Sequence, residues 1–167
     1  MVVFSLLFLT YMYYRGQDVA LFREAQTHLN QLFGAFNTLL MLTSSWLVAS
    51  AVQLARRQQP VKARGFLIGA LLCGLGFATV KYFEYSAKLD AGITLVTNDF
   101  FMYYFVLTMI HLLHVVFAMG VLVYLINLLS SGEMTERRLS FLESGASFWH
   151  VVDLLWIVLF ALLYLVN

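Results

Sequence analysis

The sequence has little charge, a single cysteine and no surplus of either sign. Only 11% of its 167 residues are Asp, Glu, Lys or Arg, whereas soluble domains contain about a quarter. The formal net charge of +1 provides no basic surface for nucleic acid, which excludes that class of partner. The one cysteine, Cys73, lies in an apolar run and can form neither a disulfide framework nor a thiolate cluster within the chain.

The motifs that soluble enzymes use are also missing. The sequence contains no glycine-rich phosphate loop and no plausible catalytic order of serine, histidine and aspartate outside the apolar runs. Proline is nearly absent, since Pro60 is the only one and falls in a short polar loop. Transporters often have helices broken by glycine or proline at mid-membrane. A small transporter is therefore the least favoured membrane class.

Apolar residues are abundant. Hydrophobic residues make up 62% of the chain, and the mean hydropathy is +0.83. A helix needs about 20 apolar residues to cross roughly 30 Å of hydrocarbon. Four runs reach that length, at residues 32–55, 65–87, 100–129 and 141–166.

A fifth apolar run, residues 1–14, would measure only about 21 Å as a helix, which is too short to span. We interpret it as the tail end of a first helix that is truncated at its start. The connections between the runs are short and polar, at residues 15–31, 56–64, 88–99 and 130–140. We therefore predict an all-α, membrane-spanning bundle of five helices that forms one domain over residues 1–167.

Lysine and arginine are distributed unevenly among these connections. Six lie in the second and fourth, namely Arg56, Arg57, Lys62, Arg64, Arg137 and Arg138. The first and third hold three, namely Arg15, Arg23 and Lys88. Because cytoplasmic loops carry the excess of these residues, we predict the amino terminus inside and the carboxyl terminus outside.

Ionisable residues within a membrane are costly and should face protein with a partner. In the last run, His150 and Asp153 are three residues apart and can meet on one helix face, which they share with two tryptophans. In the third long run, His111 and His114 share one side of the helix with Thr108. We interpret both pairs mainly as hydrogen-bonding groups between helices, with a proton relay at His150 and Asp153 as the alternative.

A further pair, Lys81 and Glu84, can neutralise each other near the end of the second long run, where Lys81 would extend toward the membrane surface. Asn37 and Ser44 in the first long run can bond across helices. The candidate polar and aromatic site residues are therefore Asn37, Ser44, Lys81, Glu84, His111, His114, Trp149, His150, Asp153 and Trp156.

A metal site is the competing interpretation. Two histidines on one face can bind the same ion but cannot occupy opposite axial positions of one haem. Further ligands would have to come from Glu84, His150 or Asp153. An independent membrane metalloenzyme with a His/Glu site stays open as the alternative function.

Four ordered segments carry a family resemblance. They are residues 37–46 (NTLLMLTSSW), 81–85 (KYFEY), 111–115 (HLLHV) and 148–156 (FWHVVDLLW). In this order they resemble subunit III of the haem-copper (cytochrome c) oxidases in its five-helix form. The details at residues 37–39 and 44–46 are most similar to the nitric oxide reductase branch, the E-type accessory subunit.

The fit has two departures. Family members usually have a glycine after the threonine of the helix that carries the two histidines, and here Thr108 is followed by Met109. They also have a carboxylate early in the first helix, at a position that would lie before Met1, which agrees with the expected truncation.

The resemblance implies a non-catalytic accessory subunit in a prokaryotic cytoplasmic membrane. It implies no catalytic, metal or cofactor residues in this chain, bound phospholipid, and a catalytic subunit I that holds haem with copper or iron. Such subunits are expected to stabilise the catalytic subunit, retain lipid and support proton uptake. The resemblance does not determine whether the complex reduces oxygen or nitric oxide, or which electron donor it uses. It also leaves open whether the chain is a permanent subunit or acts only during assembly.

Overall fold

A computed structural model of the chain describes residues 2–27, 29, 31–94, 96–130 and 135–165. Every regular element in these ranges is helical, which confirms the predicted all-α class. The predicted boundaries at residues 1 and 166 lie outside the described residues. The elements are α1 (Val2–Gln17), α2 (Val19–Thr27), α3 (Gln31–Arg56), α4 (Pro60–Asp90), α5 (Asp99–Ser130), α6 (Glu136–Phe160) and the π-helical turn η1 (Ala161–Leu165).

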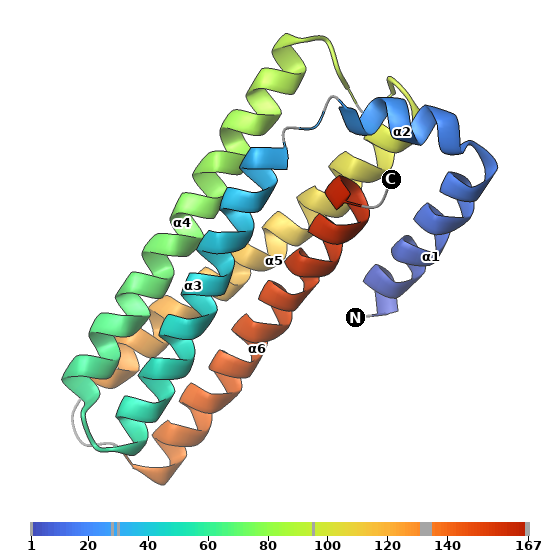
Figure 1. Cartoon of the computed structure of the whole chain (residues 1–167). Coiled ribbons are helices and arrows are strands. Elements are labelled where there is room, and N and C mark those ends of the chain that lie inside the picture. Colours follow the sequence, from blue (N-terminus) through green and yellow to red (C-terminus); the bar gives the residue numbers. More distant parts are fainter. Residues whose placement is uncertain (1, 28, 30, 95, 131–134, 166–167) are drawn as a thin grey trace.

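Helices α3 to α6 form an antiparallel four-helix bundle, in which sequential helices run in opposite directions (Figure 1). Helix α3 packs against α4 and α6, while α5 packs against the other sides of α4 and α6. In the described part of the chain, these four helices, with α6 continued by η1, are long and apolar enough to cross a membrane. The chain is thus a multi-pass membrane protein built as a helical bundle.

The helices start earlier than their apolar runs. Helix α4 begins at Pro60 rather than near residue 65, so the prediction that this proline lies in a loop is wrong. Proline suits the first helical position because the backbone N–H that it lacks has no helical partner there. Helix α6 begins at Glu136 rather than near residue 141, and the Thr135 hydroxyl caps it by accepting the Arg138 N–H at 3.4 Å.

The segment predicted as the first connection contains a helix. Helix α2 lies across one end of the bundle (Figure 1), and its Phe22 ring is buried between Tyr11 and Phe100 at centroid distances of 5.6 and 5.7 Å. The described residues therefore form six α-helices rather than five. A nine-residue helix with one apolar face is too short and polar to resemble a membrane span.

Helix α1 runs beside the bundle and packs on α5, with the Tyr11 and Tyr103 rings 5.9 Å apart. Helices α3 and α6 approach closely at Gly34. A Cβ atom there would lie 2.8 Å from the Phe160 ring and 3.0 Å from the Tyr164 ring. The glycine thus makes room for the aromatic end of α6.

Candidate functional site

The centre of the polar interior is an ion pair on α4. The Lys81 ammonium donates to Glu84 Oε2 at 2.7 Å, and the two side chains are only 1% and 4% exposed. The predicted pair is confirmed. The prediction that Lys81 extends toward the membrane surface is wrong, because its ammonium lies among aromatic rings inside the bundle.

Aromatic side chains from α5, α6 and η1 enclose the pair. The Tyr164 hydroxyl of η1 donates to Glu84 Oε1 at 2.7 Å and accepts from Lys81 at 3.1 Å. The Lys81 ammonium also lies 4.7 Å from the Trp156 ring centroid and 5.5 Å from that of Tyr104. Both carboxylate oxygens and the ammonium therefore have partners, as a buried charge requires.

The π-helical turn at the end of α6 positions Tyr164. The last carbonyls of a helix have no donors within the helix and need other partners. Side chains of three other helices donate to them. The Tyr11 hydroxyl donates to Leu162 O at 3.2 Å, the Gln26 amide donates to Leu163 O at 3.2 Å, and the Gln31 amide donates to Tyr164 O at 3.1 Å.

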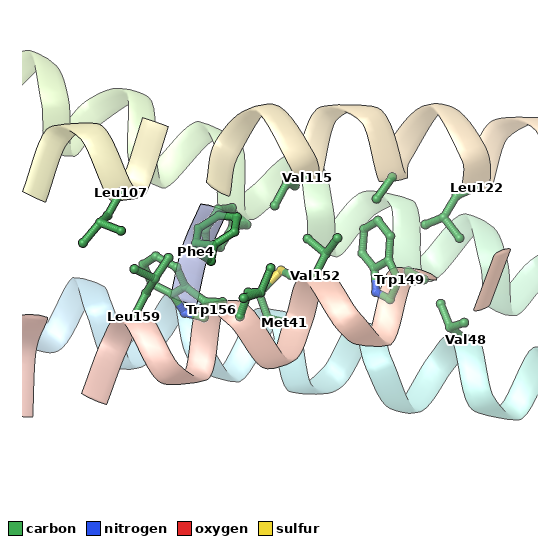
Figure 2. Close-up of a cluster of buried hydrophobic side chains, with 14 of the residues drawn as sticks. Phe4, Met41, Val48, Leu107, Val115, Leu122, Trp149, Val152, Trp156 and Leu159 are labelled. Carbon is green, nitrogen blue, oxygen red and sulfur yellow. The ribbon is translucent and has the colours of Figure 1, made fainter. Parts of the chain in front are cut away.

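Trp156 connects this cluster to the middle of the bundle. Its indole N–H donates to Thr38 Oγ1 of α3 at 3.1 Å. Its ring packs on Phe77 at 4.8 Å and on His111 at 5.4 Å, and His111 also contacts the Phe77 ring at 5.6 Å. Figure 2 shows Trp156 and Trp149 projecting from α6 into the buried cluster. His111 is fully buried among these rings.

The prediction that the two histidines of α5 form hydrogen bonds between helices is wrong for the described residues. Neither ring nitrogen of His111 has a hydrogen-bond partner there, and His114 bonds within its own helix. His114 is half-buried and lies in an outward groove beside Phe117 and Phe148. Its Nδ1 donates to Ile110 O at 2.8 Å, since a carbonyl can only accept, and its ring contacts Phe4 at 5.4 Å.

Among the described residues, His150 and Asp153 share no direct hydrogen bond, although the imidazole is close enough to interact electrostatically with the carboxylate. His150 Nδ1 instead forms a 2.7 Å hydrogen bond with the Ser45 hydroxyl of α3. Asp153 is buried nearby, and within the described residues its Oδ1 has no hydrogen-bond partner. A helix face places i and i+3 side chains together, but the neighbouring helix supplies a closer partner.

Three further predicted residues lie in the core. Ser44 bonds across helices as predicted, donating to Ala70 O at 3.1 Å. Asn37 and Trp149 are buried, and within the described part of the chain neither the Asn37 amide nor the Trp149 indole N–H forms a hydrogen bond. Their burial agrees with the prediction, but no bond across helices is found for Asn37.

The ligand set of the metalloenzyme alternative is not assembled. Among the described residues, no group of three or more His, Cys, Asp or Glu side chains is close enough to hold a metal ion. His111 is enclosed by aromatic rings, His150 bonds to Ser45, and Glu84 is bound by Lys81 and Tyr164.

Several partners were not among the predicted site residues. Each of the following contacts a predicted residue: Tyr104, Tyr164, Thr38 and Ser45. Tyr164 shares the aromatic face of α6 with Trp156 and Asp153, and this shared face is the sequence signal that could have included it. Thr38 and Ser45 can be recognised as the partners of Trp156 and His150 only from the packing of α3 on α6.

Comparison with known proteins identifies the family. Residues 19–167 match the family described as cytochrome c oxidase subunit III. The chain belongs to that family. The match begins at α2 and includes the Lys81, His111 and Asp153 positions, so the subunit III resemblance of the four ordered segments is confirmed.

Similar proteins are found in bacteria and in an archaeon. A cytochrome c oxidase subunit 3 from Synechocystis sp. is 31% identical over 98% of this chain and 69% of its own length. One from Corynebacterium diphtheriae is 25% identical over 87% of this chain and 71% of its own length. A heme-copper oxidase subunit I+III from Aeropyrum pernix is 32% identical over 80% of this chain.

The chain spans only 16% of the Aeropyrum pernix protein, and about seven tenths of the two subunit 3 relatives. Similarity to the nitric oxide reductase branch is tested by none of these matches and stays a prediction.

Proposed function

We propose that this chain is a non-catalytic subunit III that packs against the catalytic subunit I of a haem-copper respiratory complex in a prokaryotic cytoplasmic membrane. The observation that carries the proposal is the Aeropyrum pernix relative, whose name places subunits I and III on one polypeptide. Two proteins that are fused in one organism commonly work side by side when they are separate. The partner would hold the haem and the copper or iron.

The interior of the bundle supports a stabilising role. The charged atoms of Lys81 and Glu84 are bound to each other and to Tyr164, so they join α4 to η1. Trp156 and Thr38 join α6 to α3 in the same layer. Interactions of this kind fix the arrangement of helices that a large partner contacts.

The outer faces of the bundle support contact with lipid or another subunit. Large apolar side chains are exposed on every helix of the bundle, including Leu39 on α3, Leu72 on α4, Leu113 on α5 and Leu154 on α6. An exposed apolar face in a membrane protein can meet acyl chains or a second protein equally well. We assign retained phospholipid and the partner subunit to these faces.

Two finer parts of the proposal concern protons and orientation. The subunit would sustain proton uptake by the catalytic partner, and the buried polar cluster around Glu84 is where this chain gathers groups able to exchange protons. The amino terminus would lie inside and the carboxyl terminus outside. The excess of Lys and Arg at the end of the bundle that carries the α3–α4 and α5–α6 connections supports this orientation.

Co-purification tests the proposal. The tagged chain is extracted in mild detergent from its native membrane, and the eluate is examined by haem absorbance and protein identification. We expect a haem protein of the subunit I type in constant ratio to the chain, and no haem absorbance from the chain after the partner is dissociated. A tagged multi-pass protein of unrelated family from the same membrane is the control. Recovery of the intact chain without any haem protein would contradict the proposal.

The same material determines the acceptor and the contact face. Consumption of oxygen and of nitric oxide by the purified complex distinguishes an oxidase from a nitric oxide reductase. Leu113→Arg places a charge on the outer face of α5, and Leu72→Arg places the same charge on the outer face of α4. The variant whose charge falls on the face that contacts the partner should no longer co-purify with the haem protein. Retention of the haem protein by both variants would exclude both faces from the interface.

A further inference from the structure

A shallow groove of about 210 Å³ lies on the outer side of the α3–α4 hairpin, near the end where the two helices connect. It is lined by Trp46, Ser50, Gln53, Leu54, Arg57 and Phe66. This groove is separate from the region between α1 and the bundle. It takes no part in the buried cluster around Lys81 and Glu84.

The polarity of the groove changes steadily along one helix face. Trp46, Ser50, Gln53 and Arg57 follow each other at spacings of four, three and four residues, which places them in one stripe on α3 and its last turn. The order runs from an aromatic ring through a hydroxyl and an amide to a guanidinium. Phe66 of α4 forms the opposite wall, with its ring 6.3 Å from that of Trp46.

The length of this stripe corresponds to one membrane leaflet. Eleven residues separate Trp46 from Arg57, which is about 16 Å at helical rise. Half of a typical hydrocarbon layer is about 15 Å. With Arg57 at the level of the headgroups, Trp46 therefore lies deep among the acyl chains, where it is 64% exposed.

The charge at this end favours an anion. Among the described residues, the Arg57 guanidinium has no hydrogen bond or ion pair, whereas the adjacent Arg56 is bound to Glu143 at 2.8 Å. Lys62 and Arg64 lie near the start of α4, and Arg137 lies near the start of α6, at the same end of the bundle. The groove is also too small to receive the side of a transmembrane helix, which is about 10 Å across.

The geometry points to a binding site for an anionic phospholipid, with the phosphate at Arg57, the ester region beside Gln53 and Ser50, and an acyl chain along Trp46 and Phe66. Arginine binds phosphate through two parallel hydrogen bonds. The inference depends on the membrane location of the proposed function, and it gives its lipid component a definite site.

The chain contains its own reporter for this site. Of its three tryptophans, Trp149 and Trp156 are buried and only Trp46 is exposed. Bromine on an acyl chain quenches tryptophan fluorescence on contact, so quenching in this protein reads the lipid at Trp46. The full chain is reconstituted into phosphatidylcholine vesicles that contain the same minor fraction of either brominated phosphatidylglycerol or brominated phosphatidylcholine.

We expect quenching to report an apparent affinity about fivefold higher for the anionic lipid, the ratio that corresponds to about 1 kcal/mol for one basic side chain at a membrane surface. Arg57→Gln should remove this preference. Arg137→Gln, which removes an equal charge from α6 at the same end, should keep it. Trp46→Phe should lose most of the quenching, which verifies the reporter.

Equal quenching of the unaltered chain by the two lipids would overturn the site. So would an equal loss of preference in Arg57→Gln and Arg137→Gln, because that result means general attraction to a basic surface. If Arg57→Gln loses the lipid preference and still co-purifies with the haem protein, the lipid site is separate from the subunit contact. The two proposals can therefore fail independently.

Discussion

Tyr164 and Glu84, which are 80 residues apart in the chain, are joined by a 2.7 Å hydrogen bond inside the bundle. The other oxygen of the same carboxylate accepts from Lys81 at 2.7 Å. The bond connects the π-helical turn at the end of the last span to the carboxyl-terminal part of α4. It makes the charged cluster a link between helices as well as a neutral pair within one helix.

Removing the lysine alone should destabilise the bundle strongly. Lys81→Met leaves Glu84 buried without its cation, which typically costs about 3–5 kcal/mol. Replacing both residues with methionine removes both members of the hydrogen-bonded pair and should recover most of the loss. Thermal unfolding of the detergent-solubilised chain compares the three proteins. A double variant as unstable as Lys81→Met would show that the pair is required for reasons beyond charge neutrality.

The exposed ion pair should behave differently. Arg56 and Glu143 join α3 to α6 at 2.8 Å, but their side chains are 61% and 38% exposed. Exposed pairs contribute about 0–1 kcal/mol and are screened by salt. Arg56→Gln should therefore change the unfolding temperature little, and less still at high ionic strength. A loss as large as that of Lys81→Met would contradict this assignment of the buried cluster as the main electrostatic link.

Substitutions at His111 separate packing from metal binding. The imidazole is fully buried between the rings of Phe77 and Trp156. His111→Phe should retain most of the stability because it preserves an aromatic ring, whereas His111→Ala opens a cavity and should cost about 3–5 kcal/mol, as large-to-small core changes do. Thermal unfolding and elemental analysis are measured together. Stoichiometric metal in the unaltered chain that is absent from His111→Phe would support the metalloenzyme alternative and contradict a packing role for His111.

The close approach of α3 to α6 predicts a contrast between two glycines. At Gly34 a methyl group would lie 2.8 Å from the Phe160 ring, so Gly34→Ala forces the ring and the neighbouring Tyr164 to shift. Overpacking of this kind costs about 1–3 kcal/mol. Gly120 on α5 has nothing within 4 Å of such a methyl group, and Gly120→Ala should be neutral or stabilising by up to about 1 kcal/mol. Equal unfolding temperatures for the two variants would refute the contrast.

The spans could be predicted from the sequence because length and apolar composition alone set the requirement for crossing a membrane. Their ends could not, because the first turns at Pro60 and Glu136 are polar and extend the helices beyond the apolar runs. Helix α2 was missed for a related reason. Its burial depends on Phe22 contacting α1 and α5, and no local pattern reports such a contact.

In the candidate site, contacts within one helix could be predicted from the sequence, whereas contacts between helices could not. Lys81 and Glu84 were paired correctly because both lie on one helix, where spacing determines contact. The same rule did not identify the hydrogen-bond partner of His150, because Ser45 lies on a helix more than 100 residues earlier in the chain. The spacing rule also cannot predict that His111 is buried and His114 only half-buried, because it contains no information on the positions of the neighbouring helices. Interhelical partners depend on the packing of the whole bundle.

The three carbonyls of the π-helical turn accept side chains of Tyr11, Gln26 and Gln31, which belong to the first three helices. The donors and acceptors are 133 to 151 residues apart in the sequence. One short turn therefore binds α1, α2 and the start of α3 together, and a change that displaces its backbone would release all three at once.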